Sequence, residues 1–541
     1  MSESSTRDVA RGAFILVLAN FIVKVIGIFY KIPITNMAGP LAMSYFNSAF
    51  EVQQVLLTVS ISLPLAVSKM VAESAARGRG DEVRRIFRVT LVTFTCVGLL
   101  CTGIFILGAP AFAAASISVK AQYAMIALAP SLFLYAIAAT FRGLYQGLGN
   151  MLPTAATQIT EALTKLGFGV LLTYFAVRAG MGPEYVATAA ISGTTISIVF
   201  SILILIPLYF LPRTRQSMKA IPSGGECDPP FKLLRRLLAI TIPVTLSSLI
   251  VNLTSFLDLF CINDRLQFIG MTEEAANTAY GGYKSYAQLL FNLPPSLIAS
   301  VGLGIVPAIA AAHVSRKFER RNEIMNSAFR IVILLALPCA AGLTFLADPI
   351  LHMLFRNPTF ADQVDAAVPL MRMLGVASLW ACVASVTTSC LQGINKLRYP
   401  LISLGIGGAL KLICNFTLVG IPSIGINGAP IGTNLCYIAI ILSNTLMLRR
   451  HTELHFDVSS TFIKPLAAGL LMGGFSLGSY WVLHTCIGIG LTVSCLASIL
   501  LSALFYGACL VLLRCLTAED LALLPKGERI AAALRARRII K

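Results

Sequence analysis

The sequence predicts an all-α polytopic membrane protein with about 14 transmembrane helices. Of its 541 residues, 57% are hydrophobic and only 12% are charged, and the mean hydropathy is +0.81. Apolar stretches long enough to cross a hydrocarbon core of about 30 Å recur along the whole chain. Because a soluble domain carries roughly twice this charged fraction, the composition excludes a soluble fold.

Polar breaks divide the apolar stretches into fourteen expected spans. The first begins after Arg11 and is too long for a signal-peptide core, so we expect it to remain as the first helix. The thirteen cysteines form no C-x-x-C pair, and we expect buried free thiols and no metal site. The spans lie near residues 12–34, 41–67, 86–113, 121–148, 153–178, 184–211, 236–262, 280–310, 325–350, 364–391, 399–420, 427–448, 462–484 and 488–513.

The distribution of basic residues orients these spans. If the N-terminus is cytoplasmic, 31 of the 42 Lys and Arg residues lie in cytoplasmic segments and 4 in outer loops, and the remaining 7 lie within spans. The positive-inside rule therefore predicts that the N- and C-termini are both cytoplasmic. The same bias explains the net charge of +18 without a nucleic-acid partner.

The chain contains an apparent internal repeat. Pro64 and Pro307 each precede a basic loop, and Gln146 and Gln392 each precede a lysine by 19 residues. Both halves start in the cytoplasm, so we expect two parallel six-helix lobes plus two C-terminal helices, an arrangement typical of alternating access. The expected parts are the N-lobe 1–216, a cytoplasmic linker 217–235, the C-lobe 236–450, the last two spans 451–514 and a basic cytoplasmic tail 515–541.

Several charged residues lie inside the predicted spans, where a charge costs at least ~2.5–3.5 kcal/mol. Such residues are expected to face a cavity or a partner. Seven are basic and three acidic, which favours a cationic cavity for an anionic substrate such as a diphosphate. The expected substrate-binding residues are Lys24, Lys31, Arg142, Lys284 and Glu51.

Two further groups of charges have alternative interpretations. Glu161 and Lys165 have the i,i+4 spacing of a structural ion pair on one helix. Asp258 and Lys411, with Asn415 one turn later, form either a gating ion pair or a site in which Asp258 binds a proton or sodium ion. The sequence alone does not choose between these.

Several segments resemble the stage V sporulation protein B group. They are Lys24–Pro33, Leu63–Glu73, Phe141–Gly147, Pro153–Ile159 and Leu516–Leu521. This group is similar to MurJ-type lipid II flippases and belongs to the multidrug/oligosaccharidyl-lipid/polysaccharide exporter superfamily. The resemblance implies fourteen helices around a cationic cavity and a lipid tail held near the last two helices. It also implies basic substrate-binding residues in spans one, two and eight, which Lys24 and Lys284 match, whereas span two carries Glu51.

The expected function is transport of undecaprenyl-diphosphate-linked peptidoglycan precursor to the outer leaflet. The alternatives are another lipid-linked oligosaccharide (a teichoic, capsular or spore-cortex precursor), a cation/drug antiporter, and a non-transporting membrane scaffold. The sequence has no Walker motif, so we expect a transporter and not an enzyme. We expect no cofactor, an energy source in the membrane potential or an ion gradient, membrane lipids as partners, and a monomer.

Overall fold

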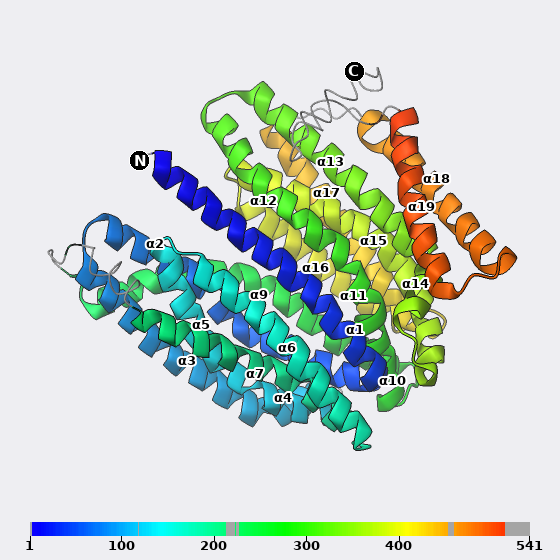
Figure 1. Ribbon diagram of the computed structural model, residues 1–541, viewed down its shortest axis with the longest axis horizontal. Helices are drawn as coiled ribbons and strands as arrows, with labels where there is room; N and C mark the ends of the chain where they lie inside the picture. The colour runs from blue at the N-terminus through cyan, green and yellow to red at the C-terminus, as the bar shows by residue number, and fades with distance from the viewer. Residues whose placement is uncertain are drawn as a thin grey trace. The chain divides into compact units, whose positions relative to one another are not determined.

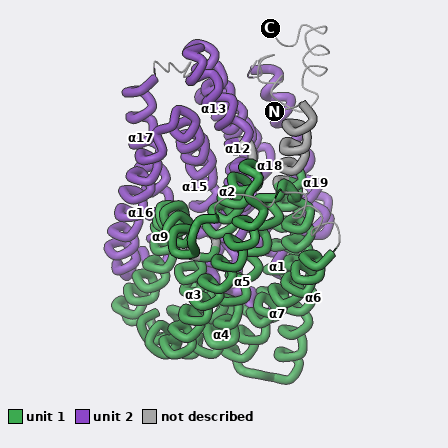
Figure 2. The backbone as a smooth tube through the Cα atoms, turned by 90° about the vertical axis from the view of Figure 1, so that its left-hand side faces the viewer, with its two compact units in different colours: residues 1–281 green, residues 282–541 purple. Residues whose placement is uncertain are grey.

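The computed structural model describes residues 3–116, 118–211, 222, 227–452, 459–513 and 515, and these are almost entirely helical (Figure 1). No strand occurs within these ranges. Many large apolar side chains are exposed along the helices, as lipid-facing residues would be. The predicted all-α polytopic membrane fold is therefore confirmed. The chain divides into two compact units, residues 1–281 and 282–541 (Figure 2).

The first unit is built from long helices joined by short turns. They are α1 (Glu3–Ile61), α2 (Leu63–Ala76), α3 (Gly80–Ala115), the 3₁₀ turn η1 (Val119–Ala121), α4 (Gln122–Leu128), α5 (Pro130–Gly147), α6 (Leu152–Arg178), α7 (Pro183–Phe210), α9 (Pro230–Phe268) and α10 (Glu273–Gly282). One buried apolar cluster joins α1, α3, α4 and α7, and a second joins α2, α3, α5, α7 and α9.

The first two expected spans form one helix, α1, with a kink at Gly39. Gly39 has φ 74° and ψ 170°, a conformation that is open essentially only to glycine. Pro40 follows it and supplies no backbone N–H to continue the helical hydrogen bonds. The chain therefore changes direction within α1 without an intervening loop.

Helices α6 and α7 approach each other closely through glycines. A Cβ atom added at Gly193 of α7 would lie 2.6 Å from the Cα atom of Gly169 on α6. A Cβ at Gly169 would lie 2.5 Å from the ring of Tyr30 on α1. These glycines allow α1, α6 and α7 to meet at backbone distance, and this contact borders the candidate site described below.

The second unit is also helical. It contains the π-helical turn η2 (Tyr283–Ala287), α11 (Gln288–Phe291), α12 (Leu293–Val314), α13 (Phe318–Phe345), α14 (Ala347–Leu354), η3 (Pro358–Phe360), α15 (Ala361–Gly393), α16 (Arg398–Leu418), η4 (Gly425–Asn427), α17 (Gly428–His451), η5 (Ser459–Ile463), α18 (Lys464–Trp481), η6 (Val482–Cys486) and α19 (Leu491–Leu512). Its core joins α12, α13, α15 and α17. The hairpin of α18 and α19, orange to red in Figure 1, packs on α13.

Twelve helical segments of the described residues are long and apolar enough to cross a membrane. The first of them, Leu18–Ala76, covers most of the first expected span and all of the second, which meet at the Gly39 kink. Helix α6 is not among the twelve, because Glu161 and Lys165 lower its hydropathy, although its 27 residues are sufficient to cross the bilayer. With these two adjustments, the twelve segments correspond to the fourteen spans expected from the sequence.

The compact units do not coincide with the boundaries expected from the repeat. The first unit includes α9 and α10, which the sequence analysis assigned to the C-lobe beginning at residue 236. Nearly half of the expected linker and nearly all of the expected tail lie outside the described residues. The division into two six-helix lobes stays a prediction.

Candidate functional site

A cavity of about 270 Å³ lies among the membrane-spanning helices of the first unit, and we call it the N-unit cavity. Both arms of α1 border it, together with α5, α6 and α7. Its walls are mainly aromatic and aliphatic, but three of its side chains carry charge. The lining residues are Val23, Gly27, Tyr30, Lys31, Phe46, Phe50, Tyr135, Glu161, Ala162, Lys165 and Ser197.

Lys165 of α6 is held against aromatic rings. Its Nζ atom lies 4.8 Å from the ring centroid of Tyr30 and 5.5 Å from that of Phe50, distances typical of cation–π contacts. Tyr30 is fixed in turn, because its hydroxyl donates a hydrogen bond of 3.0 Å to the carbonyl of Ala190 on α7. The aromatic faces thus hold an ammonium group at the cavity wall and leave its N–H donors available to an anion.

Lys31 links the two arms of α1 across the kink. Its Nζ atom donates a 3.3 Å hydrogen bond to Oδ1 of Asn47 and lies 6.0 Å from the ring centroid of Phe46. Lys31 precedes Gly39, whereas Asn47 and Phe46 follow it. The position of this cation therefore depends on the bend at Gly39.

Arg142 of α5 and Glu161 of α6 form an ion pair at the edge of the cavity. Nη2 of Arg142 lies 2.5 Å from Oε2 of Glu161 and also donates a 3.0 Å hydrogen bond to the hydroxyl of Ser201. Both charged side chains are nearly buried, with 11% and 13% exposure. The expected i,i+4 pair of Glu161 with Lys165 is corrected here. The closer approach of α5 gives Glu161 a guanidinium partner, and Lys165 turns toward Tyr30 and Phe50.

The charges in and beside the N-unit cavity do not balance. Lys31, Lys165 and Arg142 contribute three positive charges, and Glu161 contributes one negative charge. Arg142 is neutralised by Glu161, so the two lysines give the cavity an excess positive charge. An arrangement of this sign attracts phosphate or carboxylate groups and repels organic cations.

Two other residues expected at the substrate site do not border this cavity. Lys24 lies on α1 beside the lining residue Val23, and its side chain is exposed. Glu51 follows the lining residue Phe50 and is partly exposed. Their expected role in substrate binding stays a prediction.

The remaining predicted residues are divided between the two units. Asp258 of α9 is 2% exposed and belongs to the first unit. Lys411 and the fully buried Asn415 lie on α16 of the second unit, so neither interpretation of this group is tested. Lys284 lies in the π-helical turn η2 and is 7% exposed. Single π-helical turns are frequent at functional positions.

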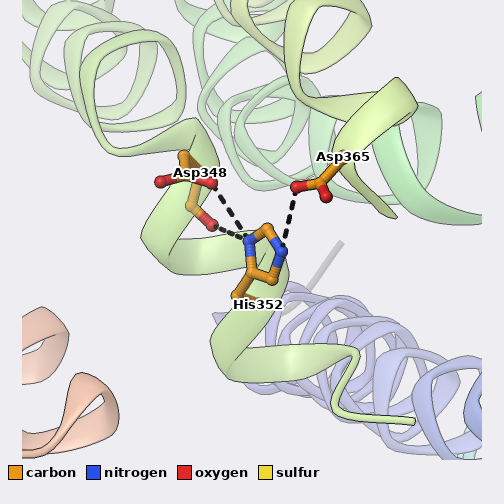
Figure 3. Close-up of side chains that lie close together, drawn as sticks. All are labelled: Asp348, His352 and Asp365. Atoms are coloured by element: carbon orange, nitrogen blue, oxygen red, sulfur yellow. Dashed lines mark hydrogen bonds and ion pairs between the residues drawn. The ribbon is translucent and has the colours of Figure 1, made fainter. Parts of the chain in front are cut away.

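A group not expected from the sequence lies in the second unit, at α14 and α15 (Figure 3). The imidazole of His352 lies between two carboxylates, with Nδ1 3.1 Å from Asp348 and Nε2 3.2 Å from Asp365. Each ring nitrogen faces a carboxylate oxygen, and one donor atom from each of the three residues lies within 4.8 Å of the other two, which is the kind of group that can hold a metal ion. The i,i+4 spacing of Asp348 and His352 could have been recognised in the sequence as a possible pair on one helix. Asp365 could not have been assigned to them, because it comes from another helix.

Comparisons with known proteins identify relatives along the chain. The model of the family described as polysaccharide biosynthesis protein matches residues 9–313, and the MatE model matches residues 243–417. Lipid II flippase MurJ of Bacillus subtilis (strain 168) is 24% identical over 83% of this chain and 84% of its own length. Stage V sporulation protein B of the same organism is 24% identical over 77% of this chain and 79% of its own length.

A solved structure supports the same assignment at the level of the fold. The inward closed conformation of lipid II flippase MurJ superimposes with a TM-score of 0.67 at 14% identity, and it covers 92% of this chain and 98% of its own chain. The resemblance inferred from the sequence motifs is therefore confirmed. The chain belongs to the polysaccharide biosynthesis protein family and is a multi-pass membrane transporter of the multidrug/oligosaccharidyl-lipid/polysaccharide exporter superfamily.

Proposed function

We propose that this protein is a flippase that moves undecaprenyl-diphosphate-linked peptidoglycan precursor, lipid II, from the cytoplasmic to the outer leaflet of the bacterial inner membrane. The observation that carries the proposal is the excess positive charge of the N-unit cavity, supplied by Lys31 and Lys165. A diphosphate has a high density of negative charge. A lysine ammonium group is a compact point charge on a flexible stem, so it can bind such an anion from many directions. The similarity to a lipid II flippase and to stage V sporulation protein B supports this class of cargo.

In the proposed cycle, the cargo diphosphate first binds the two lysine ammonium groups. Arg142 then exchanges part of its interaction with Glu161 for the diphosphate, since a guanidinium can donate to two acceptors at once. Neutralisation of the cavity removes the repulsion between cations and favours the conformation in which the cavity opens to the other side. The membrane potential or an ion gradient returns the empty carrier.

Reconstitution into liposomes tests this proposal. A fluorescent undecaprenyl-diphosphate oligosaccharide is incorporated, and a membrane-impermeant reductant reports which leaflet holds the label. The native protein is expected to make the inner-leaflet label accessible, and Lys31→Gln/Lys165→Gln to abolish this without loss of the folded protein. The matched control is Arg178→Gln/Lys120→Gln, which removes two charges from exposed positions of the same unit. Equal rates for the double lysine variant and the control would overturn the proposal.

Cation export is the second candidate, because the MatE model matches residues 243–417. It predicts that the protein binds organic cations and exchanges them for protons or sodium ions. The charge of the N-unit cavity opposes this candidate, since Lys31 and Lys165 would repel such a substrate. Uptake of a fluorescent organic cation into inverted vesicles, dependent on an ion gradient, would favour it over the flippase.

A further inference from the structure

A large groove in the second unit has a basic mouth and apolar walls. Its volume is about 1310 Å³, and it lies among α13, α15, α17 and the start of α18. The mouth includes Arg321, Arg449 and Arg450, and the walls include Leu337, Trp380 and Ile441. We call it the C-unit groove. None of its lining residues borders the N-unit cavity.

The mouth of the C-unit groove is a prearranged cationic surface. Arg321 is only 4% exposed, and its guanidinium donates two hydrogen bonds to Asn322 and lies 4.9 Å from the ring of Phe318. Arg449 and Arg450 occupy the last turn of α17 and are exposed. One carboxylate, that of Glu319, also borders the mouth, so the three arginines leave an excess of positive charge.

The apolar walls of the groove extend along the helices over distances comparable to the thickness of one leaflet. Leu337 lies 16 residues beyond Arg321 on α13, which corresponds to ~24 Å along the helix. Ile441 lies 8 residues before Arg449 on α17, or ~12 Å. The hydrocarbon of one leaflet is about 15 Å thick, so apolar walls of these lengths match lipid chains whose headgroup rests on the arginines.

We propose that the C-unit groove binds an anionic phospholipid of the leaflet that faces the basic loops. The phosphate contacts Arg321, Arg449 and Arg450, and the acyl chains lie along α13, α15 and α17. Basic pockets between transmembrane helices on the cytoplasmic side are suited to such headgroups, and anionic lipids concentrate in that leaflet. The bound lipid would fill the space between α13 and α17 and so stabilise the second unit. This binding is independent of the cargo proposed above.

Tryptophan fluorescence can measure this binding, because the chain has two tryptophans and only Trp380 borders the groove. In a Trp481→Phe background, Trp380 reports the lipid next to it. Full-length protein is titrated in detergent micelles with brominated phosphatidylglycerol or brominated phosphatidylcholine. Quenching by the anionic lipid is expected at roughly 10-fold or more lower concentration than quenching by the zwitterionic lipid, as two or three arginines would confer.

The decisive variant is Arg449→Gln/Arg450→Gln, which removes two exposed charges and leaves the helix core intact. This variant should lose most of the preference for the anionic lipid. The expected loss is roughly 10- to 30-fold, because each arginine contributes about tenfold or less. The matched control is Lys317→Gln/Arg320→Gln, because these two residues are exposed, carry the same charge and begin α13 but do not border the groove. The control should keep the full preference.

Three outcomes would overturn the proposal. One is equal quenching by the two lipids, and another is an equal loss of preference in the two double variants. The third is quenching relieved by undecaprenyl diphosphate but not by unbrominated phosphatidylglycerol, which would assign the groove to the cargo. Because binding is read without transport, failure here leaves the flippase proposal standing, and failure of transport leaves the lipid site standing.

Discussion

The guanidinium of Arg142 and the carboxylate of Glu161 lie 2.5 Å apart, joining α5 to α6 at the edge of the N-unit cavity. Both charged side chains are nearly buried, and Arg142 lies in a helical segment that is long and apolar enough to cross a membrane. Removal of one partner from a buried pair leaves the other charge uncompensated, which is more costly than removal of both.

The first prediction concerns this pair. Arg142→Met or Glu161→Met alone is expected to lower the free energy of unfolding by about 3 kcal/mol, whereas Arg142→Met/Glu161→Met restores it to within about 1 kcal/mol. Transport should stay lost in the double variant, because the guanidinium that binds the diphosphate is absent. Thermal unfolding in detergent and the liposome flipping assay measure the two effects separately. Full transport by the double variant would assign the pair to structure alone.

The second prediction concerns Lys165. Lys165→Gln should reduce flipping at least tenfold, because it removes one of the two lysine ammonium groups that line the cavity. Lys165→Arg should retain much of the activity, since a guanidinium can also lie on Tyr30 and Phe50 and donate to a phosphate. The control is Arg178→Gln at the exposed end of the same helix. Equal activity of the Gln and Arg variants would show that charge at residue 165 is not required.

The third prediction concerns the close contact of α6 and α7. Gly193→Ala should lower the free energy of unfolding by about 1–3 kcal/mol, because its methyl group would meet the backbone of Gly169 at 2.6 Å. Gly167→Ala is the matched control on α6, where nothing lies within 4 Å of an added Cβ. Alanine there should be neutral or slightly stabilising, since it favours the helix. Equal melting temperatures for the two variants would contradict the close approach.

The fourth prediction tests the orientation of the chain. Cys486 is exposed at the turn between α18 and α19, which the charge bias places outside the cell. A membrane-impermeant maleimide should label the native protein in spheroplasts, and Cys486→Ser should lose that labelling. Cys227→Ser should change only the labelling seen after permeabilisation, because Cys227 precedes α9 on the expected cytoplasmic side. The reverse pattern would place the termini outside.

The membrane fold was predictable because hydropathy and the distribution of basic residues are both properties of the sequence alone and do not depend on contacts between helices. The break expected between residues 34 and 41 falls at the kink of α1, but hydropathy could not distinguish a kink from a loop. Helix α6 was predicted as a span despite its two charges, because its apolar residues are sufficient in number.

The candidate site was predictable in its residues but not in its contacts. Lys31, Arg142, Glu161 and Lys165 were recognised because charge inside a span is costly. The spacing of Glu161 and Lys165 favoured a pair along one helix, but the approach of α5 brought Arg142 to Glu161 instead. Contacts between side chains of different helices depend on how the helices pack, and the spacing of residues along the sequence does not reveal which side chains will meet. The group of Asp348, His352 and Asp365 was missed for the same reason.

The continuity of α1 through Gly39 also limits how this protein can be recombined with its relatives. Lys31 and Asn47 are hydrogen-bonded across a single bent helix, so the first two spans form one structural unit. A chimera with a homologue must exchange residues 18–61 together or leave them together. A reporter inserted between the two spans would find no loop to occupy and would separate Lys31 from Asn47.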